Sequence, residues 1–175
     1  NNSKPFFTIG ICSFKRPQYL AESINSVLSN TYQDFEIIIS DDCSPNIDEI
    51  REALRPFRNH EKINIFFQEN NLGWSDNRNF IKNIAKGKYT IIIGDDDLFF
   101  PDSLAILSKE IKLSPNKELY LFGFELIDES GKKINSFYSP QYYNFNYNSN
   151  LLIIYYTSSH SINIIRGLTC YNFRH

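Results

Sequence analysis

The chain has 175 residues, of which 42% are hydrophobic and 15% aromatic, enough for one domain with a substantial core. Its net charge of −2 removes the electrostatic case for a nucleic-acid partner or for an anionic membrane surface. No apolar run approaches the length of a transmembrane helix, and the N-terminus lacks a charged region followed by a long apolar one. We therefore expect a cytoplasmic protein, with peripheral association at the inner face of the membrane left open.

The chain has three cysteines, Cys12, Cys43 and Cys170, which is an odd number without the spacing of a zinc site. This pattern favours free thiols in a reducing compartment. A Cys12–Cys43 disulfide is the alternative, because both residues follow predicted strands that are candidates for neighbours.

Strands and helices alternate along the first two thirds of the chain. Continuous apolar or β-branched runs predict buried strands at 6–14, 34–42, 63–68 and 89–93. Amphipathic segments predict helices at 16–30, 46–57 and 75–87, and a further helix that opens at Pro101. Alternation of this kind predicts right-handed βαβ units, and hence an α/β fold with a mostly parallel open sheet and flanking helices.

Local signals set the ends of the later elements. Ser75 or Asp76 is the expected N-cap of the third helix, and Gly87 its C-terminal stop. A strand over 118–128 is followed by the turn sequence "DESGKK", which predicts a hairpin. Beyond about residue 139 the pattern weakens, and we expect a loop or irregular structure over "YSPQYYNFNYNSN", residues 138–150.

Charged side chains gather where the predicted strands end. The segments in question are "CSFKRP", "DDCSP", "ENNLGWSDNR" and "GDDD". In an open parallel sheet, ligands bind beyond the carboxyl ends of the strands, so these acids and bases are expected to converge on one rim. Three consecutive aspartates exceed what the capping of a single helix needs, although a solvated turn with an N-cap remains the simpler alternative.

The chemistry of this rim selects among nucleotide sites. "CSFKRP" has no glycine, which argues against a dinucleotide fold, and no phosphate-binding loop of the G-x-x-x-x-G-K-[ST] type occurs. A nucleoside diphosphate fits better. Carboxylates after the second strand can accept from base or ribose, and carboxylates after the fourth can hold a divalent cation that bridges the diphosphate.

Three collinear motifs between about residues 6 and 113 resemble the family 2 nucleotide-sugar glycosyltransferases of the Rossmann-like GT-A fold. They are "TIGICSFKRPQYLAESINSVLSNTYQDFEIIISDDCS", "NNLGWSDNRN" and "GKYTIIIGDDDLFFPDSL". The resemblance implies an inverting transfer of a sugar from a nucleoside diphosphate, UDP by family frequency, to a hydroxyl of a glycan or glycolipid in bacterial polysaccharide or glycoconjugate synthesis. A catalytically inactive nucleotide-sugar-binding module of the same fold is the alternative.

The resemblance also implies a nucleotide site made of five residues. Cys12 and Ser13 would line the base pocket, and Asp42 would accept from the base or the ribose. Arg78 would lie beside base or phosphate, and Asp95 would contact the ribose. An Asx turn at Asp42 and a surface arginine at 78 are the simpler alternatives.

By the same resemblance, Asp96 and Asp97 form the metal site for Mn²⁺ or Mg²⁺, Asp96 as ligand and Asp97 in support of the loop. The family usually has an aspartate at the position of Gly94. The catalytic base is usually an acid farther along, and this chain has no Asp or Glu after Glu129. The resemblance therefore implies a donor-binding half at 1–115 and an incomplete start of the acceptor side at 116–175. Homo-oligomerisation is left open.

Overall fold

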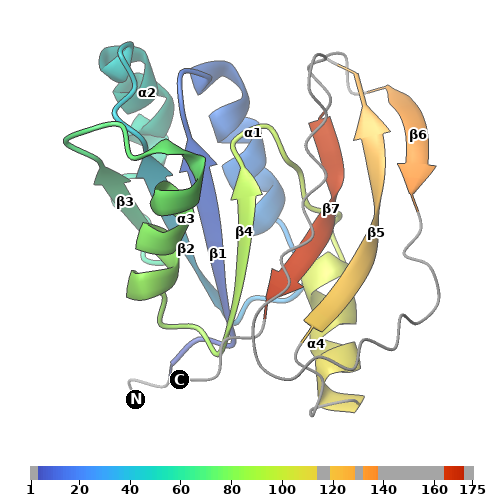
Figure 1. The fold of residues 1–175 in the computed structure, drawn as a ribbon. Coiled ribbons are helices and arrows are strands. Elements are labelled where there is room, and N and C mark those ends of the chain that lie inside the picture. The colour runs from blue at the N-terminus through green and yellow to red at the C-terminus, as the bar shows by residue number, and fades with distance from the viewer. Residues whose placement is uncertain (1–3, 114–118, 129–131, 138–163, 172–175) are drawn as a thin grey trace.

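The computed structural model describes residues 4–113, 119–128, 132–137 and 164–171. Within these residues the strands form one sheet in the order β3-β2-β1-β4-β7-β5-β6 (Figure 1). The strands are β1 (Phe7–Ser13), β2 (Phe35–Asp41), β3 (Ile63–Phe67), β4 (Tyr89–Gly94), β5 (Leu119–Ile127), β6 (Lys133–Phe137) and β7 (Ile164–Tyr171). The helices are α1 (Pro17–Leu28), α2 (Ile47–Leu54), the 3₁₀ turn η1 (Arg55–Phe57), α3 (Gly73–Ile84) and α4 (Ser103–Leu113).

The first four strands are parallel, which confirms the predicted α/β fold with an open sheet and flanking helices. β1 lies between β2 and β4, and β2 also pairs with β3. Because these strands run the same way, their carboxyl ends meet at one edge, the upper edge in Figure 1. That edge is the rim at which the sequence predicts the site.

The other part of the sheet is antiparallel. The predicted hairpin is confirmed, since β5 pairs antiparallel with β6. The segment 138–150, predicted as loop or irregular, lies outside the described residues. β7 lies between β4 and β5 and is antiparallel to both. Its sequence, IIRGLTCY, contains an arginine and a glycine that break the apolar run, so its order comes from pairing with two neighbours. Residues 138–163 and 172–175 lie outside the described residues.

Apolar side chains alternate between the two faces of the parallel strands. Ile9 and Ile11 of β1 belong to the main core, together with apolar residues of α1, α2 and α4. The opposite face carries α3, whose Ile81 packs with Cys12 and Ile38 (Figure 1). Helices thus cover both faces of the sheet and leave the ends of the strands for the site. Among the described residues, no helix has the length and apolarity of a membrane span.

The contact between α3 and the sheet depends on a glycine. A Cβ atom on Gly10 would lie 2.5 Å from Cγ2 of Ile81, closer than van der Waals contact allows. The missing side chain lets α3 approach β1 closely, which places the first turn of α3 beside the rim.

Both predicted ends of the third helix are wrong. The helix begins at Gly73, ahead of Ser75 and Asp76, and its N-cap residue makes no side-chain capping bond. It ends at Ile84, and the next residue is extended. Gly87 serves another purpose, since its N–H donates to Oγ1 of Thr8 at 2.8 Å and a Cβ there would lie 2.4 Å from the Thr8 nitrogen.

Candidate functional site

The ends of three neighbouring strands bring the predicted motifs together. The N–H of Asp42 donates to the carbonyl of Ser13 at 2.9 Å, which joins the loops after β1 and β2. Cys12 is the register partner of Gly94 at the end of β4. The side chains of Cys12 and Ser13 are both buried. Motifs that lie far apart in the sequence therefore share one rim.

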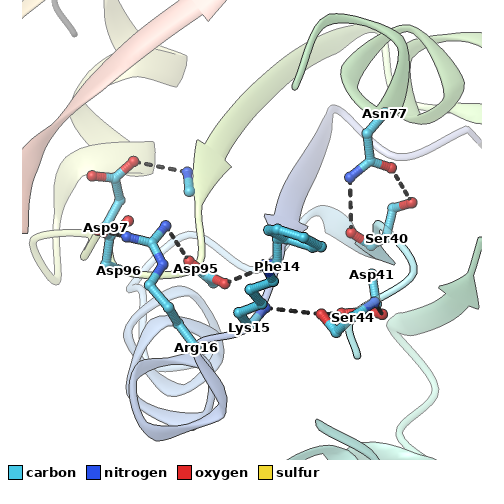
Figure 2. A network of polar contacts seen from close by, with 11 residues as sticks. Phe14, Lys15, Arg16, Ser40, Asp41, Ser44, Asn77, Asp95, Asp96 and Asp97 are labelled. Carbon is cyan, nitrogen blue, oxygen red and sulfur yellow. Dashed lines mark hydrogen bonds and ion pairs between the residues drawn. The ribbon is translucent and has the colours of Figure 1, made fainter. Parts of the chain in front are cut away.

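Arg16 links the acidic turn after β4 to the start of α1. Its guanidinium lies between two carboxylates, with Nη2 at 2.6 Å from Oδ1 of Asp95 and Nη1 bonded to Oδ2 of Asp96 (Figure 2). Asp95 is fully buried and also accepts from the N–H of Phe14 at 3.1 Å. Burial raises the pKa of Asp95 to about 6, and the positive charge of Arg16 works against that rise.

Asp97 points away from Arg16 and closes the acidic turn (Figure 2). Its Oδ2 accepts from the N–H of Gly94 at 2.8 Å. Burial, followed by the charge of Asp96, raises the pKa of Asp97 to about 7. A Cβ at Gly94 would lie 2.7 Å from Oδ1 of Asp96, so the glycine leaves room for this turn.

The acidic turn fits a hard divalent cation only in part. Within the described ranges, no three His, Cys, Asp or Glu side chains are grouped so as to hold a metal ion. The carboxylates of Asp95 and Asp96 are the oxygen donors that Mg²⁺ and Mn²⁺ prefer. A cation here would take its other ligands from water or from a bound molecule such as a diphosphate.

The two aspartates after β2 have different partners. Asp41 is fully buried, and its carboxylate accepts from the N–H and the hydroxyl of Ser44 at 3.0 and 2.6 Å. Asp42 accepts from the N–H groups of Leu72 and Gly73 at 2.7 and 2.9 Å. Asp42, which follows β2, thus supplies acceptors for backbone N–H groups at the start of α3. Its negative charge also interacts favourably with the helix dipole there. Each of its oxygens retains a lone pair for a ligand.

Arg78 projects from α3 next to the same rim. It is buried, and its guanidinium carbon lies 5.1 Å from the ring centroid of Trp74, which is half exposed. The positive charge of Arg78 lowers the pKa of the Cys12 thiol, although burial has the larger effect and raises it. Arg78 is therefore a fixed positive charge beside the end of β1.

The sequence model of the family described as "Glycosyl transferase family 2" matches residues 8–166. The chain belongs to this family. An uncharacterized glycosyltransferase of Methanocaldococcus jannaschii is 33% identical over 144 residues, which cover 81% of this chain and 49% of that protein. The chain thus spans about half the length of this relative.

Solved structures show that the chain has the GT-A fold. The Staphylococcus aureus protein TarS, residues 1–349 in complex with UDP-GlcNAc, superposes with a TM-score of 0.63 at 20% identity. The match covers 74% of this chain and 36% of that one. The mannosyltransferase PcManGT of Pyrobaculum calidifontis, in complex with GDP-Man and Mn²⁺, gives 0.60 at 17% identity and covers 69% and 36%.

Two rim residues of this chain are not among the site residues predicted from the sequence. Phe14 directly follows β1, and 36% of it is exposed, with Nζ of Lys15 4.5 Å from its ring centroid. Arg16 is the partner of the acidic turn. A large aromatic and two bases after a buried strand were the available signal, but the sequence does not show which of the two bases turns towards the acids.

Cys12 and Cys43 are both free, so a disulfide between them is wrong. Cys12 is buried, and burial raises the pKa of its thiol to about 12. Cys43 is exposed. Since the thiolate is the reactive form, we expect N-ethylmaleimide at pH 8 to modify Cys12 at least ~100-fold more slowly than Cys43. Timed labelling followed by peptide mass spectrometry measures each rate. Similar rates for the two thiols would contradict the buried position and raised pKa of Cys12.

Proposed function

We propose that the chain carries the donor site of an inverting glycosyltransferase, which moves a sugar from a nucleoside diphosphate to an acceptor hydroxyl. The observation that carries the proposal is the convergence of Asp42, Arg78, Asp95 and Asp96 on one rim of the GT-A sheet. Family membership and the nucleotide sugars bound by TarS and PcManGT support it. UDP is the first choice, as in the TarS complex.

The nucleoside would lie across the ends of β1 and β2. The exposed ring of Phe14 offers an apolar face for stacking with a base. Asp42 has lone pairs for a base N–H or a ribose hydroxyl, while Cys12 and Ser13 form the floor. Arg78 supplies a fixed positive charge beside base or phosphate.

The diphosphate would lie over the acidic turn. Asp96 is the more exposed of the two carboxylates that Arg16 contacts, so we assign it as the ligand of Mn²⁺ or Mg²⁺, with Asp95 towards the ribose. Asp97 belongs to this metal site as the residue that supports its loop, through the bond from the N–H of Gly94. When bound, such a cation neutralises the departing nucleoside diphosphate.

Displacement at the anomeric carbon also requires removal of the proton from the acceptor hydroxyl. No side-chain carboxylate follows Glu129 in this sequence, so we propose that the base is supplied from outside residues 1–175. In this division, residues 1–115 bind the donor and residues 116–175 begin the side that binds a glycan or glycolipid acceptor. That no Asp or Glu follows Glu129 is also what favours the second candidate, a nucleotide-sugar-binding module without transfer.

Calorimetric titration of UDP, GDP and dTDP into the purified chain tests the donor site. We expect one nucleotide to bind with Mn²⁺ present, and its affinity to drop at least about tenfold when EDTA replaces the metal, because the cation screens the diphosphate from Asp95 and Asp96. Failure of all three to bind to a chain with a cooperative thermal transition would overturn the proposal. Binding of UDP-sugars by the full-length protein without transfer or hydrolysis would favour the module.

A further inference from the structure

The acidic turn already has a cation of its own in Arg16. The guanidinium contacts one oxygen of the fully buried Asp95 and one oxygen of Asp96, so it bridges the two carboxylates that are candidates for metal binding (Figure 2). In a bridge of this kind two N–H groups point at the oxygen lone pairs. A divalent cation would bind to the same two carboxylates.

The guanidinium and a divalent cation therefore compete for one place. An arginine and a metal ion cannot both lie against Oδ2 of Asp96 at low cost, because two positive charges at contact distance repel. In the absence of other ligands, the cation must displace a charge-assisted pair that is partly shielded from water. The described residues offer the cation no third acid in exchange.

Arg16 is placed so that it can leave. Its backbone is fixed, because the N–H of Lys15 donates to Oγ of Ser44 at 2.8 Å and Pro17 opens α1. Its side chain, in contrast, is 41% exposed, and its long stem can rotate without moving the helix. A diphosphate at this rim would offer the guanidinium a second anionic partner that suits its planar fork.

We propose that Arg16 is the exchangeable counter-ion of the acidic turn: it holds Asp95 and Asp96 in the empty protein and turns to the diphosphate when a cation and nucleotide bind. The inference rests on the proposed donor site. It makes Arg16 a positioning residue with two effects of opposite sign. Arg16 weakens the binding of a free cation and strengthens the binding of the cation–nucleotide pair, so that the metal arrives with its nucleotide.

Mn²⁺ binding followed by electron paramagnetic resonance, without nucleotide, measures the first effect. Arg16→Ala is expected to bind Mn²⁺ about tenfold more tightly than the wild type, because the competing charge-assisted bonds are gone. Calorimetry at saturating Mn²⁺ measures the second effect, and there Arg16→Ala is expected to bind the nucleotide about tenfold more weakly. Arg16→Lys, which keeps the charge but not the fork, should shift both affinities in the same directions by less.

Arg55→Ala is the matched control, since it removes one positive charge from an exposed pair with Glu52 and should change neither affinity. Thermal unfolding shows whether each variant is folded. If Arg16→Ala is not folded, Arg16→Lys replaces it in both binding measurements. Loss of both affinities, or no change in either, would overturn the exchange. If the wild type binds no nucleotide with Mn²⁺, the proposed donor site itself fails, whereas normal wild-type binding with unaltered variants refutes only the role of Arg16.

Discussion

Replacing Asp96 by Asn is expected to lower the Mn²⁺-dependent affinity for the nucleotide at least ~100-fold while leaving the protein folded. An amide keeps the size of the carboxylate but loses the charge that a hard cation requires. The side chain of Asp96 is 16% exposed and is bonded to Arg16, which also contacts Asp95, so the arginine keeps a partner in the variant. Calorimetric titration with and without Mn²⁺, together with thermal unfolding, measures the two effects.

Asp102→Asn is the control for this change. Asp102 lies just before α4 and is exposed, so the substitution removes an equal charge from the protein without altering a proposed ligand. We expect its nucleotide affinity to match the wild type. A similar loss in both variants would mean that the net charge of the protein matters, and an unchanged affinity in Asp96→Asn would remove that residue from the metal site.

Much of the fold follows from local patterns. Runs such as "EIIIS" in β2 are apolar on both faces, and only a strand buried between two layers of helices accommodates them. The order of strands and helices then fixes the parallel sheet and its ligand-binding edge. The positions of Asp42 and Asp95 at that edge follow directly, since each comes at or just after the last residue of a strand.

Contacts between side chains that are far apart in the sequence do not follow from such local patterns. The contact of Arg16 with Asp96 joins residues 80 positions apart, and neither residue carries a local mark of it. The start of α3 was misplaced for the same reason. Ser75 and Asp76 are good capping residues, but Asp42 supplies the acceptors from another strand, and the helix begins earlier. The sequence of β7 likewise does not show that this strand pairs with β4 and β5.

The role of Asp42 in holding α3 leads to the second large effect. Asp42→Ala leaves the N–H groups of Leu72 and Gly73 without their acceptors at a partly buried helix end. We expect the free energy of unfolding to fall by about 2–4 kcal/mol, as for the loss of a helix cap and a charge-assisted bond. Nucleotide affinity should fall with it. Asp42 is itself the proposed acceptor for the base or the ribose, and Arg78 projects from the helix that Asp42 holds.

Urea unfolding gives the stability, and hydrogen exchange localises the cause. The amides of Leu72 and Gly73 should exchange faster in Asp42→Ala, while amides of β1 change only as far as global stability requires. Asp48→Ala is the matched control, because its side chain is 94% exposed and pairs only loosely with Arg51 at 3.6 Å, so its loss should cost less than about 0.5 kcal/mol. Unchanged exchange at Leu72 and Gly73 would mean that α3 begins without Asp42. In that case any loss of nucleotide affinity would report a direct contact between this carboxylate and the ligand.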